Sequence, residues 1–133
     1  MTYNFNAVWL LQSICNAEQG KNDGADLRDV ISVADYVNRA IMTYDEFCSG
    51  LELLLKLKLV EQNGVVLRTS DDFKQWYKEK FEGVKKSFPQ KERQEMEKYV
   101  QALAQNTTGD PDVSIQITEV DLGMAIKRYR ATF

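Results

Sequence analysis

A chain of 133 residues with 44% hydrophobic content can bury one sizeable core without a metal ion or a disulfide, so we expect one domain with an appended tail. The formal net charge of -3 argues against the broad basic surface of non-specific nucleic-acid binders, while it leaves room for a local basic patch. The chain contains no histidine and its two cysteines lack CxxC spacing, which excludes the usual zinc sites and His-based catalytic triads.

The N-terminal residues lack the basic start of a signal peptide, and no apolar run reaches the roughly 18 residues of a membrane span. We therefore expect a cytoplasmic protein that does not contact a membrane.

The N-terminal part of the chain predicts two helices. Apolar residues recur at helical spacing over residues 4 to 17, and the polar, glycine-rich residues 18 to 24 end this helix. Asp26 is placed to cap a second helix, whose apolar face extends from Leu27 to Ile41. The outer side of this second helix carries Arg28 and Arg39.

A third helix follows after a sharp turn. Thr43 and Glu46 have the spacing of a capping box, which satisfies two amide donors at a helix start. The helical period places one set of residues on the buried side, namely Tyr44, Phe47, Leu51, Leu54 and Leu55. The residues pointing the opposite way are Asp45, Ser49, Glu52 and Lys56.

Two β-prone runs on either side of Asn63 and Gly64 predict a hairpin with a type I′ turn, because this dipeptide tolerates a positive φ at both central positions. We expect Thr69 to cap a fourth helix, with Asp71 and Asp72 in its first turn, where the helix dipole favours carboxylates.

The C-terminal part predicts two more helices. Pro89 opens a fifth helix that reaches about residue 105, and its polar first half, residues 90 to 95, is expected to project into solvent. Apolar residues alternate as in a short strand at Val113, Ile115 and Ile117. Thr118 begins a last helix with one apolar stripe made by Leu122, Ala125, Ile126, Tyr129 and Phe133.

Residues 46 to 77 (EFCSGLELLLKLKLVEQNGVVLRTSDDFKQWY) resemble the winged helix-turn-helix transcription regulators of the MarR and PadR type. In that superfamily a leucine-rich recognition helix precedes the wing, and a further helix follows. The resemblance at fold level covers about residues 27 to 81. It implies a mainly α fold with a small β-hairpin wing and additional C-terminal helices. Two departures are Lys58 and Asp72, which stand where the family pattern has glycine, and lysine adopts the left-handed conformation at modest cost.

On this basis we expect a winged-helix domain at residues 1–83. Residues 84–133 form a helical extension, packed on the same domain or forming a dimer interface.

In DNA-binding members of such folds the third helix lies in the major groove and the wing touches phosphate or the minor groove. The resemblance therefore nominates six DNA contacts: Ser49, Lys56, Asn63, Arg68, Arg28 and Arg39. Asp45 and Glu52 on the same helix would be repelled by phosphates, so a solvated face without a binding role is an equal alternative.

Basic residues also occur in the C-terminal extension and would form one patch if its two helices packed together. They are Lys85, Lys86, Lys91, Arg93, Lys98, Lys127, Arg128 and Arg130. Interleaved lysine and glutamate is also typical of an ordinary soluble helix, which is the simpler interpretation.

The sequence contains none of the common nucleotide-binding or hydrolase motifs, so we expect no enzyme, no cofactor and no metal site. Two functions remain open. The first, placed ahead by analogy of fold, is a transcription regulator that binds double-stranded DNA. In that function the protein is expected to dimerise through its fifth or last helix. The second is a winged helix that has lost DNA binding and works in protein assembly, through a protein partner or a homodimer formed by the C-terminal helices.

Overall fold

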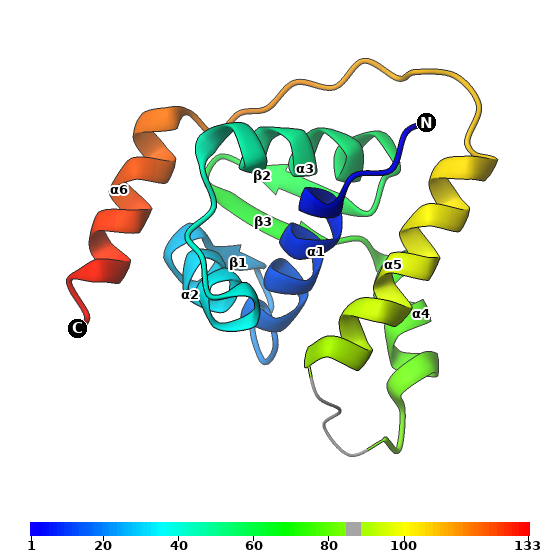
Figure 1. Ribbon diagram of the computed structural model, residues 1–133, viewed down its shortest axis with the longest axis horizontal. Helices are drawn as coiled ribbons and strands as arrows, with labels where there is room; N and C mark the ends of the chain where they lie inside the picture. The colour runs from blue at the N-terminus through cyan, green and yellow to red at the C-terminus, as the bar shows by residue number, and fades with distance from the viewer. Residues whose placement is uncertain (85–88) are drawn as a thin grey trace.

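Six helices and three short strands make up residues 1–84 and 89–133, the part of the chain that this computed structural model describes (Figure 1). In chain order they are α1 (Phe5–Ala17), β1 (Ala25–Asp26), α2 (Leu27–Asn38), α3 (Tyr44–Lys56), β2 (Val60–Asn63), β3 (Val66–Thr69), α4 (Asp71–Phe81), α5 (Pro89–Asn106) and α6 (Glu119–Arg130). The fold is mainly helical with a small sheet, as the sequence predicts. Within the described ranges, no helix combines the length and the apolar content needed to cross a membrane.

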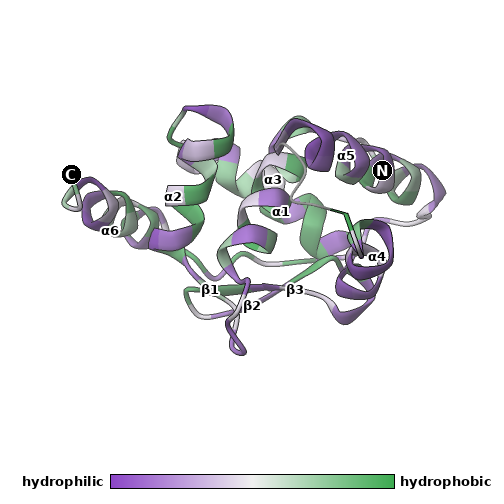
Figure 2. Ribbon diagram, turned by 90° about the horizontal axis from the view of Figure 1, so that it is seen from below, coloured by the Kyte–Doolittle hydropathy of each residue, from purple (hydrophilic) through white to green (hydrophobic). Residues whose placement is uncertain are grey.

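The strands form an antiparallel sheet in the order β1-β3-β2, and Figure 2 shows it as a layer on one side of the helices. β1 was not predicted, because two residues are too short for an alternating pattern. A Cβ atom on Gly24 would lie 2.8 Å from the carbonyl oxygen of Leu67, and φ is +97° there. The close pairing of β1 with β3 therefore requires glycine at this position.

β2 and β3 form the predicted hairpin, but the turn lies one residue later than expected. Asn63 pairs with Val66 across the hairpin, so the two turn residues are Gly64 and Val65. Of these residues only Gly64 has a positive φ, at 62°. The predicted type I′ turn at Asn63 and Gly64 is therefore wrong, and a positive φ at the first turn residue alone is what a type II′ turn requires.

α1 runs through the centre of the fold, with α2, α3, α5 and the sheet around it (Figure 1). Almost all of its circumference is consequently buried, including the polar residues Gln12 and Ser13. The indole nitrogen of Trp9 donates a hydrogen bond to the carbonyl oxygen of Ala34 on α2, at 3.0 Å. A Cβ atom on Gly50 of α3 would lie 2.6 Å from the backbone oxygen of Asn6. The backbones of α1 and α3 are therefore in direct contact where Gly50 faces Asn6.

The ends of α2 and α3 follow from local backbone chemistry. Asp26 caps α2 as predicted, accepting a hydrogen bond from the amide of Arg28 at 2.8 Å. Arg39 ends α2 in the left-handed conformation with φ of 51°, so Ile41 lies beyond the helix and the predicted face was too long. Lys58 after α3 also has a positive φ, 59°, which confirms that lysine takes the left-handed conformation here.

α4 is capped by Ser70, whose hydroxyl accepts a hydrogen bond from the amide of Phe73 at 3.2 Å. The prediction that Thr69 caps this helix was wrong, because Thr69 ends β3 and is fully buried. Its amide donates to a carboxylate oxygen of Glu18 at 3.0 Å, and its hydroxyl donates to the other oxygen. Thr69 therefore ties β3 to the end of α1.

Glu92 on α5 is also buried, so the prediction that residues 90 to 95 all project into solvent was wrong at this position. Its carboxylate accepts hydrogen bonds from Asn16 at 2.6 Å, from Gln12 at 3.3 Å and from the Tyr77 hydroxyl at 2.7 Å. One carboxylate thus joins α1, α4 and α5. A helical pattern read from α5 alone cannot reveal this, since all three donors come from other helices.

α6 begins at Thr118, which forms a capping box with Asp121, and it packs against α2. The Tyr129 hydroxyl donates a hydrogen bond to Asp35 on α2 at 2.6 Å. Phe133 is 87% exposed, so it does not extend the buried stripe as predicted, because the helix ends at Arg130. Figures 1 and 2 both place α5 and α6 on opposite sides of the molecule.

Candidate interaction surface

α3 is fixed at its start by the capping box that the sequence predicts. The hydroxyl of Thr43 accepts a hydrogen bond from the Glu46 amide at 3.1 Å, and the Glu46 carboxylate accepts one from the Thr43 amide at 2.9 Å. Packing of the apolar side onto α1 leaves Asp45, Ser49 and Glu52 exposed. The exposed side of α3 is therefore more acidic than basic.

Residues 107–118, between α5 and α6, pass over α3 and the hairpin as an extended chain, and we name them the crossing segment (Figure 1). Near its start, the Asp110 carboxylate lies 2.6 Å from the Lys56 ammonium nitrogen at the end of α3. Near its finish, the carbonyl oxygen of Ile117 accepts a hydrogen bond from the Tyr44 hydroxyl at 3.0 Å. The crossing segment therefore runs along α3 from its C-terminal to its N-terminal end.

Gln62 on β2 holds the middle of the crossing segment with both ends of its amide group. Its nitrogen donates to the carbonyl oxygen of Ser114 at 2.6 Å, and its oxygen accepts from the amide of Gln116 at 2.9 Å. The side chain of Gln116 in turn accepts a hydrogen bond from the amide of Gly64 at 3.0 Å. We call Tyr44, Lys56, Gln62 and Gly64, which bind this segment, the α3–hairpin surface.

The predicted strand at residues 113 to 117 does not form, because side chains and not a neighbouring strand bind the backbone there. The alternation nevertheless has a structural meaning. Val113 and Ile115 are half-buried and Ile117 is 1% exposed, whereas Ser114 and Gln116 are exposed. The apolar residues of the crossing segment therefore all face the body of the protein.

Lys56 and Ser49, two of the predicted DNA contacts, lie on α3. The Lys56 ammonium group pairs with Asp110 at 2.6 Å and with Glu52 at 3.0 Å, and its side chain is only 19% exposed. The hydrogen bonds that Lys56 donates to Asp110 and to Glu52 raise its pKa, with the Asp110 bond making the larger contribution. Ser49 is exposed beside a hollow of about 470 Å³ that Glu52, Lys56 and Asp110 also line. Both carboxylates that line this hollow, Glu52 and Asp110, are therefore paired with Lys56.

Arg68 and Asn63 lie on the hairpin but do not join Lys56. Arg68 pairs with Glu61 at 3.3 Å and with Asp71 at 3.5 Å. Glu61 stands opposite Arg68 in the sheet, and side chains alternate along a strand, so both lie on the face opposite to Gln62. Asn63 is exposed just before the turn.

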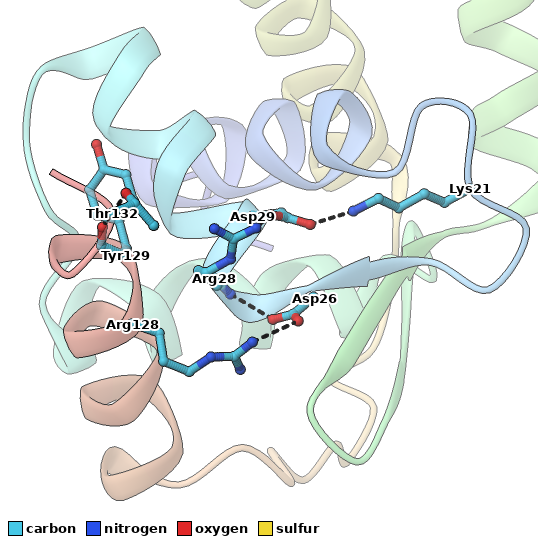
Figure 3. Close-up of polar contacts among 7 residues, drawn as sticks. All are labelled: Lys21, Asp26, Arg28, Asp29, Arg128, Tyr129 and Thr132. Atoms are coloured by element: carbon cyan, nitrogen blue, oxygen red, sulfur yellow. Dashed lines mark hydrogen bonds and ion pairs between the residues drawn. The ribbon is translucent and has the colours of Figure 1, made fainter.

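Arg28 and Arg39 lie at opposite ends of α2, about 16 Å apart along the helix axis at the rise of an α-helix. Arg28 pairs with Asp29 at 2.9 Å, and Figure 3 shows Lys21 on the same carboxylate. The nearby Arg128 on α6 lies 3.5 Å from Asp26 (Figure 3). Of the six predicted contacts, Lys56, Arg68 and Arg28 are therefore paired with carboxylates, and Arg28 and Arg39 lie at opposite ends of α2.

The sequence predicts one basic patch in the C-terminal extension if its two helices pack together. They do not, because α5 packs on α1 and α6 packs on α2. Lys85 and Lys86, which belonged to that prediction, lie outside the described residues.

Gln62, Asp110 and Tyr44 organise this surface but were not predicted to do so from the sequence. Of these residues the sequence placed Tyr44 on the buried side of its helix. The one available signal was the spacing of Val113, Ile115 and Ile117, which predicts one face covered by protein without saying by which element.

No cluster of three or more potential metal-binding side chains occurs among residues 1–84 and 89–133. Comparisons with protein-family models, curated proteins and solved structures find no match to this chain.

Proposed function

We propose that this protein is a winged helix-turn-helix module that uses its α3–hairpin surface to bind protein and not DNA. The element order supports the winged-helix part, because two helices joined by a short turn precede a hairpin, and β1 completes the sheet in the order β1-β3-β2. The sequence resemblance over residues 27 to 81 points to the same fold. Since a fold of this kind hosts several functions, the choice between partners rests on the surface.

The observation that carries the proposal is that the lysine and arginine side chains on α3 and the hairpin are already paired with carboxylates. DNA binding draws most of its affinity from lysine and arginine that neutralise phosphates. Lys56 already has two carboxylate partners and Arg68 has two others. Asp45 and Glu52 add unfavourable charge on the exposed side of α3, where a recognition helix would approach DNA. The exposed side of α3 therefore repels phosphate more than it attracts it.

The same surface binds a polypeptide within this chain. Tyr44 and Gln62 contact three backbone groups of the crossing segment, the carbonyls of Ser114 and Ile117 and the amide of Gln116. Backbone contacts of this kind are how proteins commonly bind extended peptides. This supports a protein partner.

A duplex-binding titration tests the proposal. With labelled DNA of random sequence at low ionic strength, we expect no binding by the unmodified protein. Replacing Asp45 and Glu52 with lysine tests the reason: the variant is expected to gain affinity that decreases with salt, by about 0.9 log units per phosphate contact and log unit of salt. Salt-dependent binding by the unmodified protein would overturn the proposal in favour of a DNA-binding regulator.

Site-specific photo-crosslinking tests directly for a protein partner. A crosslinking residue in place of the exposed Ser49 on α3 is expected to form adducts that resist nuclease and are digested by protease. The control carries the same residue in place of Gln75, which is exposed on α4. Nuclease-sensitive adducts at Ser49, or equal adducts at both positions, would contradict a protein-binding role for this surface.

A further inference from the structure

The crossing segment is bound to the body of the protein by side chains and not by backbone pairing. β2 is an edge strand, yet residues 107–117 make no backbone-to-backbone hydrogen bond with it, or with any other part of the body that the structure describes. The contacts run instead through the side chains of Tyr44, Gln62 and Gln116. Most of these bonds are exposed to solvent, where exchange with water makes each of them weak. Of the crossing segment only Ile117 is fully buried.

The contacts also define what this surface recognises. Lys56 pairs with the carboxylate of Asp110. Counted from Asp110, the residues that face the body follow at intervals of three, two and two positions, at Val113, Ile115 and Ile117. The Gln62 amide binds the backbone on either side of Ile115, at Ser114 and at Gln116, and makes no hydrogen bond with the side chains of those two residues. An extended segment with the pattern Asp-x-x-Val-x-Ile-x-Ile therefore satisfies every one of these contacts.

We infer that the crossing segment is an exchangeable internal ligand, and that the partner of the α3–hairpin surface is an extended polypeptide with this same pattern of one carboxylate and three alternating aliphatic residues. The inference rests on the proposed protein-binding function and names the partner's chemistry and its regulation. Because the internal ligand is tethered, its effective concentration is about millimolar, and a partner binds tightly only when it displaces residues 107–118.

Peptide binding to the 133-residue chain tests this inference. The probe is a fluorescently labelled peptide of residues 108–119, TGDPDVSIQITE. One protein variant weakens the internal ligand through Asp110→Ala and Gln116→Ala, two exposed positions whose replacement leaves the core intact. We expect this variant to bind the peptide about tenfold more tightly than the unmodified protein, because the tethered competitor is weaker.

Further variants identify the surface. Adding Gln62→Ala to the weakened variant is expected to abolish the gain, since the peptide backbone loses both amide contacts. Adding Gln75→Ala, whose side chain bonds only to Glu79 on α4, is the matched control and is expected to leave the gain unchanged. A peptide with serine at the positions of Ile115 and Ile117 is expected not to bind.

Equal peptide affinity in the unmodified and weakened proteins, or equal affinity for the serine peptide, would overturn the inference. Those results would leave the proposed function standing, because it is decided by the duplex titration. Salt-dependent DNA binding would overturn the proposed function whatever the peptide does.

Discussion

α5 and the crossing segment both lie against the N-terminal part of the fold, but they are attached in opposite ways. α5 is attached through Glu92, a buried carboxylate with three donors from two other helices. The crossing segment is attached mostly through hydrogen bonds that are exposed to solvent and through an ion pair whose Asp110 side chain is 79% exposed. Burial removes competition from water, so the polar contacts of the first attachment cost more to break than those of the second.

This difference separates structural from exchangeable contacts in one small protein. Polar groups occur in both places, so the number of hydrogen bonds does not distinguish them. What distinguishes them is whether the donor is left without water when its acceptor is removed. The following predictions test that distinction, from the largest expected effect to the smallest.

Glu92→Ala is expected to lower the free energy of unfolding by about 3 kcal/mol, because Gln12, Asn16 and Tyr77 lose a buried acceptor. Chemical denaturation monitored by tryptophan fluorescence measures this change. Glu97→Ala on the same helix is the control, with an expected loss below about 1 kcal/mol, since its one hydrogen bond, from Gln101, is exposed. Equal losses in the two variants would show that Glu92 does not fasten α5.

Leu122→Ala is expected to destabilise α6 by about 2 kcal/mol, because Leu122 is 1% exposed and its removal leaves a cavity against α2. Hydrogen exchange is the measurement. Amides of α6 are expected to exchange faster while those of α1 keep their protection, since α6 packs on α2 alone among the major helix contacts. Met124→Ala, at a position 60% exposed, is the control. Faster exchange throughout the protein would contradict an independently opening α6.

High pH is expected to reduce stability through Tyr3. Burial raises the pKa of this tyrosine from 10.0 to about 12, so above pH 10 the unfolded chain loses the proton while the folded chain keeps it. Stability that is present below pH 10 is therefore lost between pH 10 and pH 12. The loss stays below about 1.4 kcal/mol per pH unit, because solvent screens the half-buried ring.

Denaturation at a series of pH values checks this slope. Tyr3→Phe is expected to reduce it, and Tyr36→Phe, at a position 75% exposed, is expected to retain it. An unchanged slope in Tyr3→Phe would assign the alkaline loss to other groups.

Asp110→Ala is expected to change the free energy of unfolding by less than about 0.5 kcal/mol, because its ion pair with Lys56 is exposed. The same variant is expected to speed hydrogen exchange at the Gln116 amide, which reports release of the crossing segment. Asp112→Ala, exposed and two residues further along, is the control and is expected to leave exchange unchanged. A large loss of global stability in Asp110→Ala would place the crossing segment among the structural contacts.

Short-range chemistry explains the successful predictions. The capping box at Thr43 and the Asp26 cap involve residues two or three positions apart, so the sequence contains both partners of each hydrogen bond. The errors of one residue, at the hairpin turn and at the cap of α4, arose because neighbouring residues have similar local preferences. Strand pairing in one case and the Thr69 contact with Glu18 in the other selected the outcome.

The candidate surface could not be predicted in the same way, because its partners are far apart in the chain. Gln62 and the crossing segment are separated by more than 50 residues, as are Lys56 and Asp110. The sequence did indicate that residues 113 to 117 present one apolar face, since alternation is a local pattern. It could not indicate what that face covers.

The sequence by itself therefore determined the helices, the caps of α2, α3 and α6, the presence of the hairpin and the acidic side of α3, because each of these depends on residues close together in the chain. Only the tertiary structure decided that Glu92 is buried, that β1 pairs with β3, and that a segment between α5 and α6 lies over α3. These outcomes depend on which surfaces lose contact with water when elements distant in the sequence pack together. Whether a residue is buried or exposed is therefore set by the whole folded chain and cannot be read from one segment.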